Sequence, residues 1–133
     1  YGPFDEKRTY SPGSYDDIFV IPWKEQVIGL QICEDLWFPT VSRKLKELGA
    51  TVLISINGSP YEAGKNVTRR KVASLRNRET DLPIIYVNMM GGQDELVFDG
   101  DSFILTKTEL LNFKVFDIHN DSSLSVGLYR NNL

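Results

Sequence analysis

The chain has 133 residues, of which 41% are hydrophobic and 25% are charged, and its formal net charge is −3. A chain of this length can bury about two-thirds of its unfolded surface, so a hydrophobic core is feasible. The weak negative charge and the short basic run 69–71 argue against nucleic acid, and no apolar stretch approaches a membrane span. The single cysteine excludes an internal disulfide, and we expect a cytoplasmic protein without membrane or nucleic-acid partners.

Apolar segments alternate in type along the chain, which predicts an α/β fold. Four apolar runs are predicted strands: residues 17–23, 27–32, 51–56 and 83–88. Two helices are predicted between them, over residues 41–48 and from about 66 to 80. In the second helix we expect Val72, Ala73 and Leu75 to face inward and the arginines to face solvent.

The last third of the chain shows shorter alternating patterns, over residues 102–105, 110–116 and 124–129. These patterns predict antiparallel hairpins that complete the sheet and carry no chemistry. No linker rich in Pro, Gly or Ser interrupts the chain, so we expect one domain or part of one. The only histidine, His119, lies in a polar turn and is expected to be a solvated loop residue.

Cys33 ends an apolar strand and is followed by Glu34 and Asp35. In an open α/β sheet this position faces the crevice where ligands bind, so the thiol is placed like a nucleophile. The alternative is that Cys33 is a small buried hydrophobe, which is the commoner role of a free cysteine. A papain-like pair with His119 is disfavoured, because that histidine lies in a polar turn.

A second candidate site follows the next strand, at residues 57–65. Loops after successive parallel strands line one crevice, so Ser59 and Lys65 could contact a ligand held over Cys33. The alternative is a turn and helix start in which these side chains only satisfy the backbone.

Two other clusters of charged residues are expected to have structural rather than catalytic roles. Arg76 and Glu79 are helix neighbours and are expected to form a surface ion pair. The acidic residues of 94–95 and 99–101 lack the spacing of a calcium loop, and turns are rich in Asp for backbone reasons. We therefore predict no metal site.

Three segments together resemble the glutaminase domain of glutamine-dependent NAD synthetases, a branch of the nitrilase or carbon-nitrogen hydrolase superfamily: residues 32–39, 57–61 and 92–100. Residues 1–8 resemble the segment that follows the catalytic lysine of that family. The resemblance weakens after Phe103, where the superfamily usually has a glycine-bearing hairpin. It implies a nitrilase-type α-β-β-α sandwich, of which residues 1–133 would form the C-terminal part.

The family uses a Glu-Lys-Cys triad, and the resemblance assigns only its cysteine, Cys33, to this chain. The lysine would lie a few residues before Tyr1 and the glutamate further upstream. Replacement of these residues by Glu6 or Lys7 is disfavoured, because both lie in an exposed polar run. Three residues match glutamine-binding positions of the family: Tyr1, Ser59 and Lys65.

The resemblance implies hydrolysis of L-glutamine through a thioester on Cys33, with ammonia passed to an ATP-dependent domain that aminates deamido-NAD. No phosphate-binding loop is recognisable here, so no cofactor is expected in this chain, and ATP and Mg²⁺ are implied for the synthetase domain. The expected partners are the upstream half of the glutaminase domain, the synthetase domain and further copies in a homo-oligomer. A free-standing amidase for another amide and a non-catalytic structural fragment remain alternatives.

Overall fold

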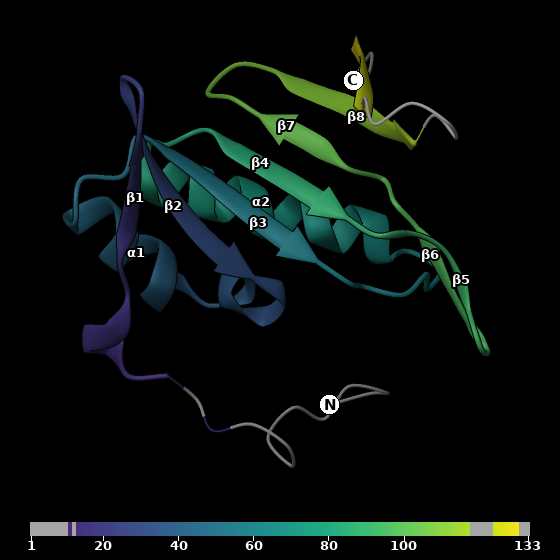
Figure 1. Cartoon of the computed structure of the whole chain (residues 1–133), viewed down its shortest axis with the longest axis horizontal. Helices are drawn as coiled ribbons and strands as arrows, with labels where there is room; N and C mark the ends of the chain where they lie inside the picture. The colour runs from purple at the N-terminus through teal and green to yellow at the C-terminus, as the bar shows by residue number, and fades with distance from the viewer. Residues whose placement is uncertain (1–10, 12, 118–123, 131–133) are drawn as a thin grey trace.

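A computed structural model describes residues 11, 13–117 and 124–130 of the chain. Within these residues, one mixed sheet forms the body of the molecule (Figure 1). From edge to edge its strands are β1 (Val20–Trp23), β2 (Gln26–Ile32), β3 (Val52–Asn57), β4 (Ile84–Asn88), β7 (Phe103–Leu105), β8 (Leu110–Asp117) and β9 (Leu124–Arg130). A separate hairpin of β5 (Met90–Gln93) and β6 (Leu96–Asp99) extends beyond the end of β4.

Strand direction changes across the sheet as the sequence patterns predict. The strands β2, β3 and β4 are parallel, and each consists mainly of aliphatic residues. The strands β7, β8 and β9 continue the sheet by antiparallel pairing, and β1 pairs antiparallel with β2 at the other edge. The predicted α/β fold with an antiparallel tail is therefore present.

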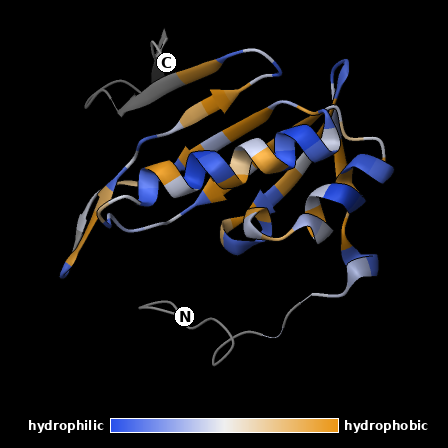
Figure 2. Ribbon diagram, turned by 180° about the vertical axis from the view of Figure 1, so that it is seen from behind, coloured by the Kyte–Doolittle hydropathy of each residue, from blue (hydrophilic) through white to orange (hydrophobic). Residues whose placement is uncertain are grey.

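Helices cover one face of the sheet, as Figures 1 and 2 show from opposite sides. They are the 3-10 turn η3 (Cys33–Trp37) and the α-helices α1 (Pro39–Glu47) and α2 (Lys65–Thr80). A further 3-10 turn, η2 (Tyr15–Asp17), precedes β1 and has no buried residue. The helix predicted over 41–48 begins earlier, because Pro39 occupies the first helical position, where its missing N–H costs nothing. The turn η3, which begins at Cys33, lies between β2 and that helix, a feature that the hydrophobic spacing did not predict.

Strand register sorts the side chains onto two faces. On the helix side, Gly29 pairs with Leu53 and Leu53 with Ile84, and these aliphatic side chains belong to the buried core. At Gly29 a Cβ atom would lie 3.1 Å from the Cβ atoms of both Leu45 and Ala50. A glycine is therefore required here so that α1 can pack closely against β2.

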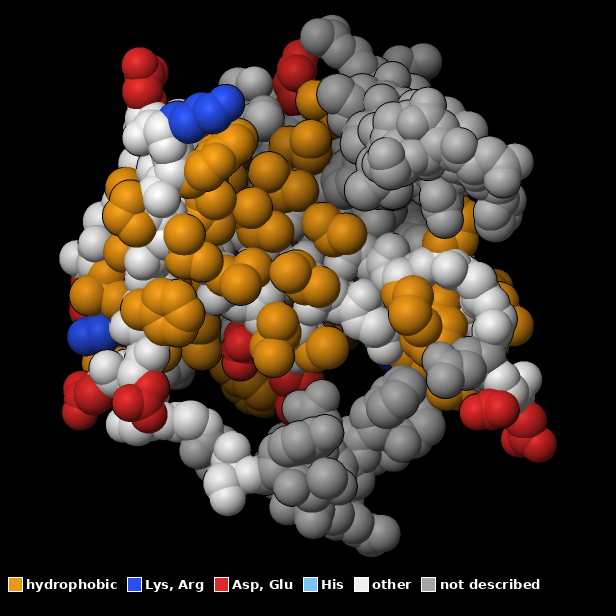
Figure 3. Space-filling view, in the orientation of Figure 1, with side chains coloured by type: hydrophobic (Ala, Val, Ile, Leu, Met, Phe, Trp, Pro, Cys, Tyr) orange, Lys and Arg blue, Asp and Glu red, His pale blue; other side chains and the backbone are white. Residues whose placement is uncertain are grey.

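The opposite face of the sheet is apolar and open. Leu30 pairs with Ile54, and Ile32 pairs with Ile56, so these side chains form adjacent rows. Leu30, Ile32 and Ile56 are 38%, 56% and 49% exposed, respectively. Figure 3 shows hydrophobic side chains gathered over this side of the sheet, and no described element crosses it. We refer to these rows, residues 28, 30, 32, 52, 54, 56, 85 and 87, as the open sheet face.

The inward face of α2 differs from the prediction. Ala73 is buried as expected, but Leu75 is 46% exposed, whereas Arg69 and Arg76 are buried. The buried positions 69, 73, 76 and 80 follow the three- and four-residue spacing of a single helical stripe. The expectation that all arginines face solvent is wrong, because each buried arginine has a carboxylate partner: Asp99 of β6 for Arg69, and Glu79 of the same helix for Arg76.

None of the helices among the described residues has both the length and the apolar character that crossing a membrane requires.

Candidate active site

Cys33 occupies a sharp turn at the end of β2. It is the first residue of η3, is partly exposed, and has a φ of +46°. The carboxylate of Asp35 accepts a hydrogen bond of 3.0 Å from the backbone N–H of Ile32 and thereby closes the turn. Left-handed backbone is uncommon for non-glycine residues and is found repeatedly at active sites, including nucleophiles placed between a strand and a helix.

The loop after β3 leaves the sheet beside Cys33. Ile32 and Ile56 are register partners in parallel strands, so Cys33 and Asn57 lie at the same edge of the sheet. Asn57 is in turn paired with Asn88, the last residue of β4. The carboxyl ends of the three parallel strands β2, β3 and β4 therefore lie side by side, the arrangement expected for a ligand site in an α/β sheet.

Asn88 fixes the conformation of the loop at Ser59. The backbone N–H of Ser59 donates to Oδ1 of Asn88 (2.9 Å), and Nδ2 of Asn88 donates to the Ser59 carbonyl (3.2 Å). The same Nδ2 donates to the carbonyl of Gly100 (2.9 Å), which ties in the segment after β6. Because Asn88 is buried, these bonds form away from competing water.

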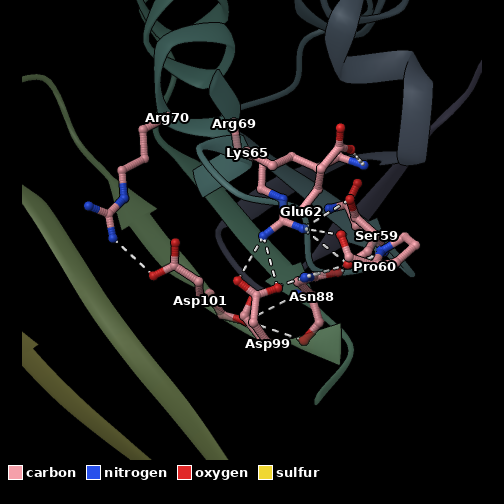
Figure 4. A network of polar contacts seen from close by, with 12 residues as sticks. Ser59, Pro60, Glu62, Lys65, Arg69, Arg70, Asn88, Asp99 and Asp101 are labelled. Carbon is pink, nitrogen blue, oxygen red and sulfur yellow. Dashed lines mark hydrogen bonds and ion pairs between the residues drawn. The ribbon is translucent and has the colours of Figure 1, made fainter. Parts of the chain in front are cut away.

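Arg69 holds the loop from the helix side (Figure 4). Its side chain is 1% exposed, and Nη1 lies 3.2 Å from a carboxylate oxygen of Asp99. Its Nη2 donates to the carbonyl and hydroxyl oxygens of Ser59 and to the carbonyl of Pro60. Sequence reasoning missed Arg69, although its position four residues before buried Ala73 is the one signal that could have revealed it.

Lys65 begins α2, directly after this loop. Its Nζ lies 3.6 Å from the carboxylate of Glu62, and its side chain is 26% exposed. Gly64 precedes it with a φ of +78°, a left-handed conformation that allows the chain to turn into the helix. Lys65 thus lies at the border of the Ser59 loop with a partly exposed side chain, and Figure 4 shows it together with Glu62 and Ser59.

Tyr86 lies on the helix side of β4, where it pairs with Ser55 and stacks on Phe103 with ring centroids 4.8 Å apart. Burial raises the pKa of Tyr86 to about 12, against the opposing effect of the Arg69 cation. The negative charges of Cys33, Asp99 and Asp101 add to the rise in this pKa. The phenol is therefore protonated at neutral pH, and sequence reasoning did not single it out.

The remaining candidates divide into structural pairs and residues outside the described part. Nη1 of Arg76 lies 2.8 Å from the carboxylate of Glu79 as predicted, but the arginine is buried, so this is not the surface pair expected. Asp99 and Asp101 pair with Arg69 and Arg70, and no three potential metal ligands gather within the described residues. Tyr1, Glu6, Lys7 and His119 lie outside the described residues.

The fold and the strand-end cysteine define a class of protein that comparison with known families identifies. The profile of the family "Carbon-nitrogen hydrolase" matches residues 2–107. The chain belongs to the carbon-nitrogen hydrolase family.

Within this family the chain is similar to glutamine-dependent NAD⁺ synthetases, as its motifs predict. It is 45% identical to the enzyme of Rhodobacter capsulatus over 102 residues, which cover 77% of this chain and 18% of that protein. It is 36% identical to the enzyme of Thermotoga maritima over 139 residues, which cover 96% of this chain and 24% of that protein. The chain therefore spans about a fifth to a quarter of the length of these synthetases.

Solved structures confirm the partial nitrilase-type fold. The glutamine-dependent NAD⁺ synthetase of Acinetobacter baumannii, in complex with ADP, matches with a TM-score of 0.77 at 34% identity, covering 97% of this chain and 24% of that one. A nitrilase-superfamily amidase from Nesterenkonia sp. AN1 matches with a TM-score of 0.68 at 26% identity, covering 80% of this chain and 39% of that one. In one structure of that amidase, the acetamide moiety of fluoroacetamide is added covalently at the active-site cysteine.

Proposed function

We propose that residues 1–133 form the C-terminal part of the glutaminase domain of a glutamine-dependent NAD synthetase. In this proposal Cys33 is the nucleophile, and the loop carrying Ser59 binds L-glutamine together with Tyr1 and Lys65. Sequence identity supports a synthetase over a free-standing amidase, since it is 34–45% to the synthetases and 26% to the Nesterenkonia amidase.

The observation that carries this proposal is the position of Cys33. Its thiol lies on a left-handed turn at the end of a parallel strand, beside a loop fixed by buried Asn88 and Arg69. A cysteine that served only to fill the core would not need a partly exposed position on a tightly held turn. Fixed geometry around a nucleophile is what a covalent reaction requires.

The reaction follows from thiolate chemistry. Sγ of Cys33 attacks the γ-amide carbon of glutamine, and the resulting tetrahedral intermediate expels nitrogen as ammonia once that nitrogen has received a proton. A water molecule then attacks the thioester, which releases glutamate and regenerates the thiol. Proton transfer at both steps requires a general base, and the developing oxyanion requires a cation or N–H donors.

These two supporting groups are assigned by family resemblance to a glutamate and a lysine upstream of Tyr1. Without this base and this cation, the isolated 133-residue chain would be inert as a glutaminase. The ammonia would serve an ATP- and Mg²⁺-dependent synthetase domain in the complete protein, and this chain itself would bind neither cofactor. Assembly of that complete protein as a homo-oligomer belongs to the same proposal.

A labelling experiment on the complete protein tests this proposal. A diazoketone analogue of L-glutamine should alkylate Cys33, and peptide mass spectrometry should locate the adduct there. L-glutamine should slow this labelling, whereas D-glutamine should not, and a Cys33→Ala protein should remain unmodified. Labelling that is insensitive to L-glutamine would contradict a glutamine site at Cys33 and leave the amidase alternative.

A further inference from the structure

The side chain of Arg69 is sealed from solvent, yet it contacts the loop that borders Cys33. With 1% of its side chain exposed, Arg69 cannot itself contact a ligand bound at Cys33, at the carboxyl ends of the parallel strands. Its guanidinium group bridges two segments: Nη1 binds both carboxylate oxygens of Asp99 at 3.2 and 3.3 Å, and Nη2 binds the Ser59 loop. Any influence of Arg69 on a ligand must therefore act through another residue.

The contact between Arg69 and Ser59 determines how the serine hydroxyl can bond. Nη2 lies 3.0 Å from the carbonyl oxygen and 3.0 Å from Oγ of Ser59, and 3.2 Å from the carbonyl of Pro60. An arginine has donors only, so Oγ must accept in this contact. Within the described part of the chain no group accepts the hydroxyl proton of Ser59, which leaves this proton free to donate to a ligand.

We propose that Arg69 is a positioning residue that sets Ser59 as a hydrogen-bond donor toward an acceptor oxygen of the substrate, either a carboxylate or an amide carbonyl. The inference rests on the glutaminase function proposed above and names a residue through which that function selects its substrate. A serine held in this way favours an acceptor oxygen over an ammonium group, since its O–H is left to donate and the Arg69 contact already occupies one of its two lone pairs.

The shape of the guanidinium group explains why an arginine occupies this position. One nitrogen binds Asp99 while the other reaches the loop, and this requires a planar fork with donors on two sides. A lysine has one ammonium group and cannot satisfy both places, although it keeps the charge that Asp99 needs. Arg69→Lys should therefore keep the positive charge that neutralises Asp99 while losing the hydrogen bond that positions Ser59.

The test uses the complete protein and measures the L-glutamine concentration that half-protects Cys33 from the diazoketone analogue. We expect Arg69→Lys and Ser59→Ala each to raise this concentration about tenfold, the loss typical of one hydrogen bond to a charged partner. The double variant should also show about a tenfold rise, not a hundredfold one, because both changes remove the same hydrogen bond.

Two controls distinguish positioning from general damage. The rate of Cys33 alkylation by iodoacetamide, which does not depend on glutamine binding, should stay within about twofold of the unsubstituted protein in Arg69→Lys. Arg76→Lys changes another buried arginine of α2, whose carboxylate partner is Glu79 on the same helix, and should leave the half-protecting concentration of L-glutamine unchanged.

The outcomes separate this inference from the proposed function. An unsubstituted protein that L-glutamine does not protect would overturn both. If L-glutamine protects the unsubstituted protein but the half-protecting concentration is unchanged in Arg69→Lys, only the role of Arg69 is overturned. The same holds if the double variant raises this concentration by the product of the two single effects. If Arg69→Lys fails to fold, Asp99→Asn retains the arginine but loosens its orientation, and an unchanged half-protection concentration in that variant would also overturn the inference.

Discussion

Ile32 and Ile56 face each other across the parallel strands β2 and β3, so the residues that follow them leave the sheet side by side. This pairing places Cys33 beside the loop that carries Ser59, although 26 positions separate the two residues in the sequence. Because parallel strands end at one edge, the sheet itself assembles the candidate site from distant segments.

The first prediction concerns Lys65, whose ammonium group is partly exposed beside the Ser59 loop. In the complete protein, Lys65→Ala should weaken glutamine binding by about 1–3 kcal/mol, or roughly five- to 150-fold in KM, because a charged hydrogen bond is lost. Steady-state glutaminase kinetics measure this change, and kcat should change less than KM.

Lys71→Ala supplies the control, because this lysine lies on the exposed side of the same helix. Glu62→Gln removes the ion pair of Lys65 and should change protein stability by less than about 1 kcal/mol, since Glu62 is largely exposed. Unchanged glutamine kinetics in both Ser59→Ala and Lys65→Ala would exclude this loop from the site.

The second prediction concerns the close packing of α1 on β2. Gly29→Ala would place a Cβ 3.1 Å from the Cβ atoms of Leu45 and Ala50, which move only with their backbones. We expect a loss of about 1–3 kcal/mol, seen as a lower urea midpoint of unfolding. Gly13→Ala is the matched control, because no atom lies within 4 Å of its added Cβ. Equal midpoints in the two variants would contradict the packing described.

The third prediction concerns alkaline pH. Because burial raises the pKa of Tyr86 to about 12 in the folded protein, the unfolded chain loses this proton first, near pH 10. Between pH 10 and 12 the unfolded state therefore binds fewer protons, and the free energy of unfolding falls as pH rises.

This fall should amount to something on the order of 2 kcal/mol and should be absent from Tyr86→Phe. Urea unfolding of both proteins at pH 8 and pH 11 measures the difference. A parallel loss of stability in the two proteins would show that other groups cause the alkaline sensitivity.

Long aliphatic runs made the central strands predictable from sequence. The predicted strands 27–32, 51–56 and 83–88 agree with β2, β3 and β4 to within about one residue at each end. Helix α2 was likewise placed to within one residue, since its ends are marked by Gly64 and the polar turn after Thr80. The spacing of apolar residues is therefore sufficient to predict an element whose apolar residues are buried along its whole length.

The inward face of α2 and the candidate site depend on distant partners, which local patterns do not contain. Arg69 is buried because Asp99, thirty positions later, returns to neutralise it. The strand-end position of Cys33 was predictable, but its left-handed backbone was not, because the bond from Ile32 to Asp35 that closes the turn has no hydrophobic signature. The hairpin β5–β6, which includes Gly91 and Gly92, gave too weak a strand signal.

The fourth prediction concerns the open sheet face. The exposed aliphatic rows that include Leu30, Ile32 and Ile56 should cause the isolated 133-residue chain to self-associate, which light scattering and gel filtration would detect. Replacing Ile32 and Ile56 by Lys should reduce this association in the isolated chain but destabilise the complete protein, where we expect the upstream half of the domain to cover the face.

The same isolated chain should release no glutamate from glutamine above its Cys33→Ala control. Coexpression with the upstream segment should restore glutamate release, because we propose that this segment supplies the base and the oxyanion cation. A monodisperse, active fragment would contradict this interpretation, and Glu34 would then be the first carboxylate to test as the base.

The most direct test of the central claim compares two nitrogen sources in the complete protein carrying Cys33→Ala. NAD formation from deamido-NAD and ATP is followed with L-glutamine in one reaction and with ammonium chloride in the other. If Cys33 is the glutaminase nucleophile, glutamine-supported NAD formation should fall by several orders of magnitude while ammonia-supported formation stays near that of the unsubstituted protein. Retained glutamine-dependent activity, or equal loss of both activities, would contradict the account.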